Sequence, residues 1–323
     1  MSPLPVPATL LNFLRSGKRF IVAGHKEPDG DCIGSQLALV SVLGRMGKHA
    51  LACSAGPFKR PEVLPYAPLF TAKPSEAELK GARVLIMDCS NAARTGDLEP
   101  YLKDLPLGII DHHATAENYG TVSYIDSGAP SVTFMVLALI EALGMTPTRE
   151  EAELLFFGLC TDTGFFRHVD EGGEAVFEYA ARLIRAGASP KRTFLAMNGG
   201  KSLNSRLLMG KVLSRAEAHY GGRLLISTET LEETEMYGMQ GRDSDALYQL
   251  LQSVAGVDAV VLLRQETTDN CTVGFRSRGS VDVAAIAARF GGGGHKQAAG
   301  LSTTGKVAEL REKIVAAFGE VLL

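Results

Sequence analysis

Three short, largely apolar runs in the first third of the chain each lead into acidic residues. The runs and the residues that follow them are 19–24 with His25, Asp29 and Asp31, Val84–Met87 with Asp88, and Leu107–Ile110 with Asp111, His112 and His113. Runs of this length without polar alternation are typical of strands buried on both faces of a parallel sheet. Because ligands of such sheets bind beyond the carboxyl ends of the strands, the pattern predicts one cleft lined by these acids and imidazoles.

Helical patterns separate the runs. Apolar residues recur at helical spacing over 33–43, 131–143 and 150–159, and a further short strand is predicted over 49–54. Strands that alternate with helices predict an α/β domain with a mostly parallel sheet. Asp162 follows the last of these helices and forms the fourth acid-bearing segment.

A change of pattern divides the chain. Its 323 residues exceed one compact core of ordinary size, so two domains are expected. The segment Ala186–Pro190 interrupts the first pattern, and a helix is predicted over 205–219. The later elements predicted are strands at 223–228, 258–264 and 271–276 and a helix at 282–290. We therefore expect a first domain over 1–195 that carries the acids, a helical linker over 196–220, and a smaller α/β domain over 221–323.

Charge and cysteine content exclude several classes of protein. The net charge is −3 and no run of Lys or Arg occurs, whereas proteins that grip long duplex nucleic acid usually carry a basic stripe. No apolar stretch approaches the ~18 residues of a membrane span. The five cysteines have no paired spacing, which favours free thiols in the reducing cytoplasm over disulfides or a structural zinc site. We expect a cytoplasmic protein that handles a small substrate or the end of a strand.

The four acid-bearing segments together suit divalent cations. Packing these carboxylates close together would cost several kcal/mol in repulsion and desolvation, and two divalent cations would remove that cost. Carboxylate and imidazole ligands without thiolate suit Mn²⁺, with Mg²⁺ or Co²⁺ as substitutes. Two ions about 3.5–4 Å apart would clamp the attacking and leaving oxygens of a phosphoryl displacement. Asp88 is the expected bridge, because a carboxylate has two oxygens.

Each segment also has a structural interpretation. Pro28–Asp31 has the composition of an exposed turn, and in the metal-site interpretation Gly30 lets that turn aim both carboxylates inward. Asp88 or Asp162 could cap a helix, and the histidines after Asp111 could be a buried structural pair. Because all four segments share one chemistry and three of them follow predicted strands, we favour metal ligation for the set.

A second candidate site lies in the C-terminal part of the chain. Arg276 and Arg278 end a predicted strand and share a face if the strand continues through them, and arginine can place two parallel hydrogen bonds on a phosphate. Four glycines and a histidine follow a predicted helix, and successive glycine N–H groups can form a nest for one anion. A flexible linker is the alternative for the glycines. The expected substrate-binding residues are Arg276, Arg278, Gly292, Gly293, Gly294 and His295.

The order and spacing of these motifs resemble the DHH phosphoesterase superfamily. The matching segments are, in order, His25-x-x-x-Asp29-Gly-Asp31, Asp88, Asp111-His112-His113 and Asp162. The glycine-rich stretch is similar to the first type of DHH-associated C-terminal domain, so the resemblance covers nearly the whole chain. Length and two-domain plan are most similar to the bacterial oligoribonuclease and pAp-phosphatase branch. Gly24, where the family usually carries Ser or Thr, and Cys32, where Ala is common, depart from the pattern.

The resemblance implies a role for each residue. One Mn²⁺ would be held by His25, Asp29 and Asp88, and the other by Asp31, Asp88, His112 and Asp162. His113 would face the scissile phosphate or the leaving oxygen, and Asp111 would orient a histidine ligand from behind. The implied catalytic residues are therefore Asp88, Asp111 and His113. The C-terminal domain would hold the far end of the substrate across an interdomain cleft.

The implied activity is that of a Mn²⁺-dependent phosphoesterase. It would release 5′-mononucleotides from very short oligonucleotides and convert pAp to AMP and phosphate. Hydrolysis of c-di-AMP or of its linear product pApA is the alternative within the same enzyme class, and a nucleotide sensor without turnover is the alternative outside it. The sequence leaves open the direction of digestion, the preference between RNA and DNA, and the choice between a monomer and a homodimer.

Overall fold

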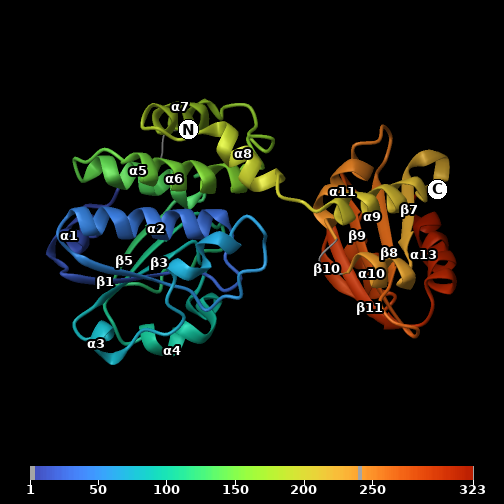
Figure 1. The fold of residues 1–323 in the computed structure, drawn as a ribbon, viewed down its shortest axis with the longest axis horizontal. Coiled ribbons are helices and arrows are strands. Elements are labelled where there is room, and N and C mark those ends of the chain that lie inside the picture. Colours follow the sequence, from blue (N-terminus) through green and yellow to red (C-terminus); the bar gives the residue numbers. More distant parts are fainter. Residues whose placement is uncertain (1–3, 239–241, 323) are drawn as a thin grey trace. The chain divides into compact units, whose positions relative to one another are not determined.

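The computed structural model describes residues 4–238 and 242–322, and the chain divides into two compact units, Met1–Gly200 and Lys201–Leu323 (Figure 1). Each unit has its own sheet and its own hydrophobic core. The first sheet is parallel and five-stranded, and the second is mixed. The predicted α/β class, with a parallel sheet in the N-terminal part and a separate C-terminal α/β domain, is confirmed.

The sheet of the first unit has the order β2-β1-β3-β4-β5, and every neighbouring pair is parallel. Its strands are β1 (Arg19–Ala23), β2 (His49–Cys53), β3 (Arg83–Met87), β4 (Leu107–Asp111) and β5 (Val122–Ile125). The first four lie where the apolar runs predict them. The sequence does not predict β5, because four residues of mixed polarity are too few to show a period.

Helices cover both faces of this sheet, as strands without polar alternation require (Figure 1). One face carries α1 (Ala8–Ser16), α2 (Gly30–Arg45), α5 (Val132–Ala142) and α6 (Arg149–Asp162), with α7 (Glu174–Arg185) and α8 (Pro190–Asn198) packed on α6. The other face carries the short helices α3 (Glu76–Leu79), η2 (Ala92–Leu98) and α4 (Glu99–Leu102). Along β1, the side chains of Phe20 and Val22 pack into the core on the first of these faces. Those of Ile21 and Ala23 pack into the core on the opposite face of the same sheet. The helices cover the two faces of the sheet, so a site can form at the carboxyl ends of its strands.

Glycines bring α2 and α6 unusually close together. A Cβ atom on Gly30 would lie 2.4 Å from the side chain of Thr161. A Cβ atom on Gly34 would lie 2.4 Å from the backbone oxygen of Leu154. Neither distance is possible for a real side chain, so the spacing of the two helices requires glycine at both positions.

The start of α2 differs from the prediction. The helix begins at Gly30 rather than Ile33, so Gly30 and Asp31 lie in its first turn. Asp29 is the N-cap, and its Oδ1 accepts a hydrogen bond from the Cys32 backbone N–H at 3.1 Å. The exposed-turn alternative is therefore wrong, and the predicted turn at Gly30 is instead a buried first turn of helix. The cap fixes the carboxylate of Asp29 at the helix start.

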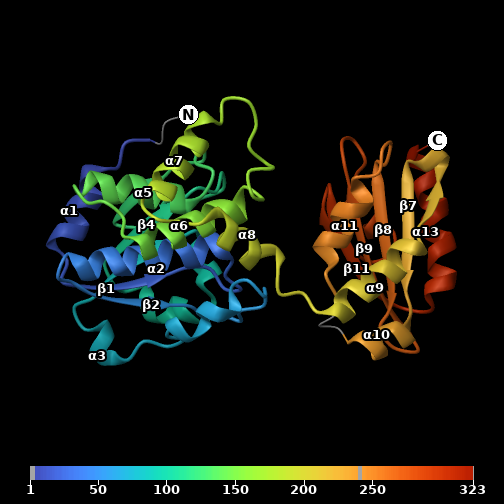
Figure 2. The same cartoon turned by 45° about the horizontal axis from the view of Figure 1, so that its top comes forward.

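The sheet of the second unit has the order β10-β11-β9-β8-β7-β6. Its strands are β6 (Glu217–His219), β7 (Leu224–Glu229), β8 (Ala259–Gln265), β9 (Asn270–Ser277), β10 (Gly293–His295) and β11 (Ala298–Thr304). β7 and β8 are parallel, and the other neighbours are antiparallel. One face is covered by α9 (Leu203–Ser214) and α11 (Ser244–Gln252), and the other by α12 (Val283–Ala288) and α13 (Val307–Leu322) (Figure 2).

The helix predicted to join the two domains is part of the second unit. It ends at Ser214, and Glu217–His219 forms the edge strand β6, so the helix predicted over 205–219 is too long at its C-terminal end. Leu208 and Val212 of α9 are buried against the second sheet and α11. This burial explains why the division between the units falls after Gly200 rather than beyond the helix.

All five cysteines are free and buried, as their spacing predicts. Cys32, Cys53, Cys89 and Cys160 lie in the first unit, and Cys271 lies in the second. Within residues 4–238 and 242–322, no helix combines the length and the apolar character that crossing a bilayer requires.

Candidate metal centre

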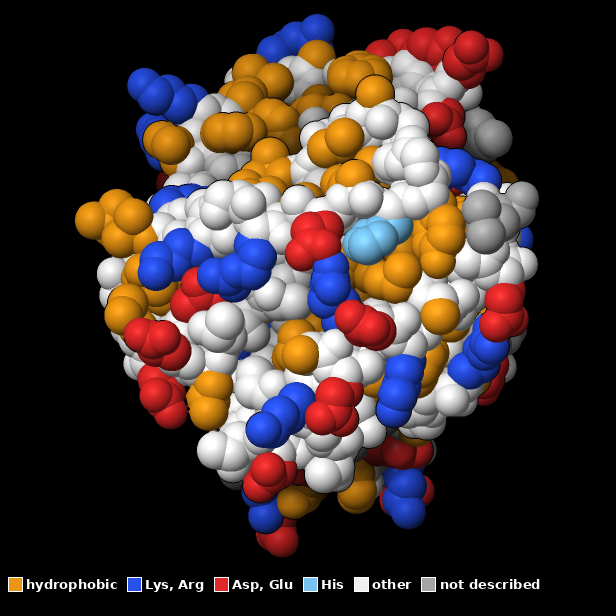
Figure 3. Space-filling model, turned by 90° about the vertical axis from the view of Figure 1, so that its right-hand side faces the viewer, with side chains coloured by type: hydrophobic (Ala, Val, Ile, Leu, Met, Phe, Trp, Pro, Cys, Tyr) orange, Lys and Arg blue, Asp and Glu red, His pale blue; other side chains and the backbone are white. Residues whose placement is uncertain are grey.

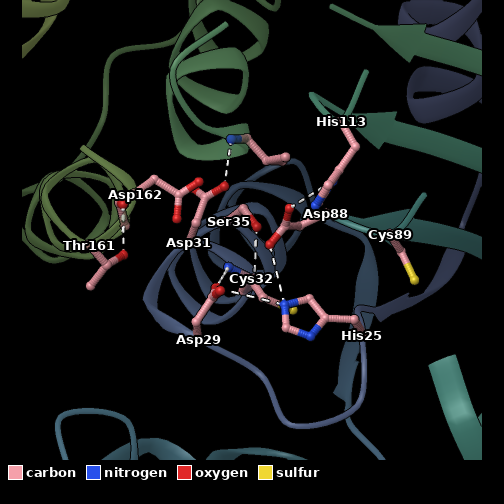
Figure 4. A network of polar contacts seen from close by, with 12 residues as sticks. His25, Asp29, Asp31, Cys32, Ser35, Asp88, Cys89, His113, Thr161 and Asp162 are labelled. Carbon is pink, nitrogen blue, oxygen red and sulfur yellow. Dashed lines mark hydrogen bonds and ion pairs between the residues drawn. The ribbon is translucent and has the colours of Figure 1, made fainter. Parts of the chain in front are cut away.

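Acids and imidazoles of the first unit meet at the carboxyl edge of its sheet (Figure 4). The elements that position them are β1 for His25, the start of α2 for Asp29 and Asp31, β3 for Asp88, β4 for Asp111, His112 and His113, and the end of α6 for Asp162. His25 Nε2 lies 3.4 Å from Asp88 Oδ2, and His112 Nε2 lies 3.3 Å from Asp162 Oδ2. The structure therefore brings all the proposed ligands together. The reason is that the carboxyl ends of neighbouring parallel strands meet at the same edge of the sheet.

The backbone orients the two imidazoles beside Asp88. His25 Nδ1 lies 2.8 Å from the carbonyl oxygen of Lys26, and His112 Nδ1 lies 3.1 Å from that of Ala129. A carbonyl oxygen only accepts hydrogen bonds, so each Nδ1 donates and each Nε2 faces the carboxylates. This is the orientation in which a histidine binds a cation through Nε2 while its other nitrogen is held by the protein.

Asp88 lies at the centre of the cluster. Its φ of 55° is left-handed, a conformation that Asp adopts at lower cost than most residues. Oδ2 is 3.4 Å from His25 Nε2, and Oδ1 is 3.6 Å from His112 Nε2. Oδ1 is buried and has no hydrogen-bond partner, an arrangement that is costly by itself and that fits a cation at this place. Asn91, not Asp88, caps the helix that follows, so the capping alternative for Asp88 is wrong.

Two further carboxylates repel each other across the cluster. Asp31 is fully buried and accepts hydrogen bonds from the N–H groups of Val132 and Thr133 at 2.6 and 2.8 Å. Burial, followed by the charge of Asp88, raises the pKa of Asp31 to about 7. Burial and the charges of Asp31 and Asp88 raise the pKa of Asp162 to about 9. A bound divalent cation would relieve this repulsion and keep both groups ionised.

The imidazoles compensate Asp88 more than they compensate the other acids. Burial raises the pKa of Asp88, but the neighbouring imidazoles of His112 and His25 outweigh it and hold that pKa below its usual value. Burial lowers the pKa of His112, but Asp88 and Asp31 outweigh it and raise that pKa to about 10. The repulsion between carboxylates is therefore least relieved at Asp31 and Asp162.

Asp111 orients the second histidine of the run. Its Oδ1 accepts a hydrogen bond from His113 Nδ1 at 2.7 Å and another from the His112 backbone N–H at 2.8 Å. Asp111 thus orients the ring of His113, whereas the ring of His112 is oriented by the carbonyl of Ala129, and support of a metal-binding histidine by Asp111 stays a prediction. The bond to Asp111 leaves Nε2 as the nitrogen of His113 that can face a substrate.

The donor atoms fall into groups that suit divalent cations. Three groups, with ligand atoms within 4.8 Å of one another, are Asp31 with His112 and Asp162, Asp88 with His112 and His113, and His25 with Cys32 and Asp88. Arg60 compensates the charge weakly, since its Nη1 is 4.0 Å from Asp29 Oδ2 and its side chain is 56% exposed. Oxygen and nitrogen donors with excess negative charge fit hard and borderline divalent ions.

Cys32 belongs to this centre although no sequence motif predicts it. Its side chain is wholly buried, and its sulfur belongs to the donor group of His25 and Asp88. The signal was its place directly after Asp31. That signal becomes informative only once the helix is known to begin at Gly30, because the helix start decides where each side chain of the first turn points.

A cavity of about 300 Å³ lies next to the centre, with Asp162 in its wall. Its lining also includes His168, the acids Asp170 and Glu171, and the pair Gly172–Gly173. The volume is at the lower end of the range for small-ligand pockets. The loop over 168–173 is not predicted to belong to the site, because none of its residues follows a strand.

The glycine-rich stretch of the second unit is a strand rather than a nest. Gly293–His295 pairs with β11, and the N–H groups of Gly291 and Gly292 donate to the carbonyl oxygens of Ala288 and Ala287. The predicted nest of successive free N–H groups is therefore wrong. The physical reason is that β11, which the sequence analysis does not predict, supplies a partner strand for the glycines.

The two arginines of the second unit differ in their surroundings. Arg276 lies on β9 with its guanidinium 4.7 Å from the centre of the Tyr248 ring. β9 ends at Ser277, so Arg278 lies beyond the strand, and its side chain is exposed. The condition set for a shared strand face is thus not met, and binding of a substrate by these arginines stays a prediction.

The two units match two families. Residues 19–159 match the DHH family, N-terminal domain, and residues 221–322 match the DHHA1 domain. The chain is 33% identical over 286 residues to the bifunctional oligoribonuclease and PAP phosphatase NrnA of Thermus thermophilus, covering 88% of this chain and 84% of the relative. It is 29% identical over 288 residues to the protein of the same name from Bacillus subtilis, covering 87% and 88%.

A solved structure supports the fold over nearly the whole chain. An exopolyphosphatase-related protein from Bacteroides fragilis aligns with a TM-score of 0.81 and 22% identity. The alignment covers 97% of this chain and 96% of that protein. At 22% identity, this likeness shows the fold alone.

Proposed function

This chain belongs to the DHH family, with a DHHA1 domain after its DHH domain, and on that premise we propose that it hydrolyses phosphoester bonds in short oligonucleotides and in pAp. The family membership makes it a metal-dependent hydrolase. The relatives named oligoribonuclease and PAP phosphatase support the two substrates, since they align with the chain over most of its length.

The observation that carries the proposal is the buried, unpartnered Oδ1 of Asp88, which lies 3.6 Å from nitrogens of both His112 and His113. We assign two cations to this centre, the first held by His25, Asp29 and Asp88 and the second by Asp31, Asp88, His112 and Asp162. Divalent cations bound there would polarise the phosphoryl oxygens and activate a water molecule. Mn²⁺ is our proposed ion for the oxygen and nitrogen donors, with Mg²⁺ or Co²⁺ as substitutes.

The chain's own contribution to proton transfer is assigned to His113. Asp111 accepts the Nδ1 proton of this ring at 2.7 Å and so fixes both its tautomer and its direction. A ring that also carries a proton on Nε2 can donate it to the leaving oxygen, while Asp111 stabilises the positive charge. We therefore propose that His113 Nε2 contacts the scissile phosphate or the leaving oxygen.

The cavity beside Asp162 supports a substrate with a nucleoside next to the scissile bond. Its volume of about 300 Å³ accommodates a small ligand, and the acids Asp170 and Glu171 in its wall disfavour phosphate there. Figure 3 shows basic and acidic side chains interspersed on one face of the molecule, without a continuous basic surface on that face. This pattern favours short strands over long duplexes.

The second unit is proposed to bind an anionic part of the substrate. Arg278 and His295 are exposed, and His295 lies on the edge strand β10. A guanidinium and an imidazole at such positions can reach a phosphate through their side chains, without the nest that the structure lacks within its described residues. Our proposed contact residues remain Arg276, Arg278, Gly292, Gly293, Gly294 and His295.

A rate comparison on three substrates tests the proposal. The purified protein with Mn²⁺ is given pAp, pApA and c-di-AMP, and the release of AMP and phosphate is followed. We expect pAp and pApA to be hydrolysed and the Asp88→Asn variant to be inactive on both. Faster hydrolysis of c-di-AMP would favour a cyclic-dinucleotide phosphodiesterase, and tight binding without product in single-turnover assays would favour a sensor.

We also propose a cytoplasmic location, because the chain keeps five free thiols. Cell fractionation followed by immunodetection tests this location. Detection only in an oxidising compartment would contradict it.

A further inference from the structure

A thiol lies among the donors of the first proposed cation. Ligand atoms of Cys32, His25 and Asp88 lie within 4.8 Å of one another, and all three residues are buried. In Figure 4 the side chain of Cys32 lies beside the ring of His25. Asp88 turns Oδ2 toward this group, at 3.4 Å from His25 Nε2, so the thiol lies with an imidazole and a carboxylate in one compact set of donors.

The position of the sulfur is fixed by its surroundings. Cys32 follows Asp31 on the first turn of α2, and its Sγ lies 3.4 Å from Gln36 Oε1. Gln36 cannot turn away freely, because its Nε2 donates to the carbonyl oxygens of Val22 and Cys53 at 3.0 Å each. The sulfur is therefore held at the metal-facing start of the helix.

Gly24 provides the space that the sulfur occupies. A Cβ atom on Gly24 would lie 2.2 Å from Cys32 Sγ, far inside van der Waals contact. Gly24 directly precedes His25, so the sulfur fills the volume next to the backbone of a proposed ligand. This contact supplies a way to displace the sulfur without removing it.

We propose that Cys32 Sγ is a ligand of the cation held by His25 and Asp88, and that this half of the centre prefers a borderline-soft divalent ion such as Zn²⁺ or Co²⁺. The inference rests on the metal centre of the proposed function and refines it. Thiolate favours these ions over Mg²⁺ and Mn²⁺, whereas the group of Asp31, His112 and Asp162 has only oxygen and nitrogen donors. The two halves of the centre would thus differ in the ion that they select.

The bonding change is simple. The S–H bond of the thiol breaks and its proton passes to solvent, the hydrogen bond from the thiol to Gln36 Oε1 is lost, and a sulfur–metal bond would form. No electron is transferred, and no further reactant is required. Metal binding at this half would accordingly release a proton from Cys32.

Cobalt spectroscopy tests the sulfur bond directly. Co²⁺ is added to the metal-free full-length protein, and absorbance is recorded in the visible region for bound cobalt and in the near ultraviolet for thiolate-to-cobalt charge transfer. We expect both signals in the wild type, and loss of the charge-transfer band alone in Cys32→Ala and Cys32→Ser. Cys89→Ala is the matched control, because this buried thiol follows Asp88 but lies outside the donor group, and it should keep the band.

A second pair of variants separates ligation from space filling. Gly24→Ala should displace the sulfur and abolish the band while Cys32 is still present, and the double variant Gly24→Ala/Cys32→Ala should recover the thermal stability lost by the single one. In Cys32→Ala the Kd for Zn²⁺ should rise by at least about 10-fold, and the Kd for Mn²⁺ should change little. X-ray absorption of the zinc-loaded wild type should show a sulfur neighbour at about 2.3 Å.

The outcomes distinguish this inference from the proposed function. Bound cobalt without a charge-transfer band, or a band that persists in Cys32→Ala, would overturn the sulfur ligand and leave the phosphoesterase proposal intact. Absence of any bound cobalt would overturn both. Hydrolysis of pApA by the wild type tests the function independently of the spectrum.

Discussion

Each unit of the molecule buries a cluster of acids, but the partners of those acids are opposite in kind. In the second unit, Glu229 pairs with Arg242 at 2.7 Å and with Arg264 at 3.1 Å, and Arg242 also pairs with Glu266 at 2.9 Å. In the first unit, Asp88 lies among imidazoles at 3.4 and 3.6 Å and keeps one oxygen unmatched. One cluster is neutralised by the chain itself, and the other is not.

This difference shows that acids alone do not identify a functional site. A guanidinium keeps its charge at any physiological pH and forks two hydrogen bonds onto carboxylates, so the network around Glu229 is complete as it stands. An imidazole can give up its proton and let a cation take its place beside a carboxylate. The partners therefore separate a structural cluster from a site that binds something from outside.

The largest expected effect is loss of turnover when the unmatched acid is neutralised. Asp88→Asn keeps a residue that tolerates the left-handed backbone but removes the charge, so kcat/KM on pApA should fall by more than about 100-fold. The control is Asp104→Asn, which changes an exposed acid of the same unit. If Asp88→Asn retained a tenth of the activity or more, the charge of Asp88 would not be essential for turnover, and the contrast between the two clusters would fail.

The next effect concerns stability of the second unit. Glu229→Gln leaves two largely buried guanidiniums without their shared carboxylate and should lower the free energy of unfolding of this unit by about 3 kcal/mol. Amide hydrogen exchange in β8 and β9 measures this loss, and Glu235→Gln, at an exposed position, is the control. Unchanged exchange would mean that the arginine network is not the structural element that we infer.

Metal addition should stabilise one unit only. A cation at 100 times its Kd stabilises the state that binds it by about 2.7 kcal/mol, so Mn²⁺ should slow amide exchange in α2 and α6 but not in β8. Asp88→Asn should lose the effect. Equal protection of both units by Mn²⁺ would contradict a centre confined to the first.

The smallest effect is a pH dependence in the second unit. Hydrogen bonds with Arg215 lower the pKa of Glu233 from 4.5 to about 2, so this pair stabilises the fold fully above pH 4.5 and loses its effect as the pH falls toward 2. Because Arg215 is 37% exposed, we expect only about 1–2 kcal/mol. Arg215→Gln should flatten the stability profile between these pH values, as measured by urea denaturation. A profile that kept its slope would assign the pH dependence to other groups.

The sequence predicts the proposed ligands well because their signal is local. A buried strand is visible as an apolar run, and the acid after it must lie at the carboxyl edge, whatever the rest of the sheet does. His25, Asp88 and Asp111 are found in this way. Asp162 is found because it ends a helical pattern and shares its chemistry with the others.

The errors arise where pairing with another strand, or the exact start of a helix, decides the local structure. Gly293–His295 becomes a strand only because β11 lies beside it, and α9 ends at Ser214 because β6 pairs with β7. Cys32 becomes a donor only because α2 begins at Gly30 and Gly24 leaves room for the sulfur. These partners lie nearby in the sequence, but strands of three residues and a helix start give no apolar period from which a pattern could show them.

The close crossing of α2 and α6 extends the sensitive region of this enzyme beyond its ligands. Asp31 lies on α2 and Asp162 ends α6. The distance between these two aspartates therefore depends on how closely the helices approach each other at Gly30 and Gly34. A single methyl group at Gly34 would push against the backbone of Leu154 and spread two proposed metal ligands that it never touches. Natural variants of this enzyme are therefore expected to tolerate change at Gly34 as rarely as at the aspartates themselves.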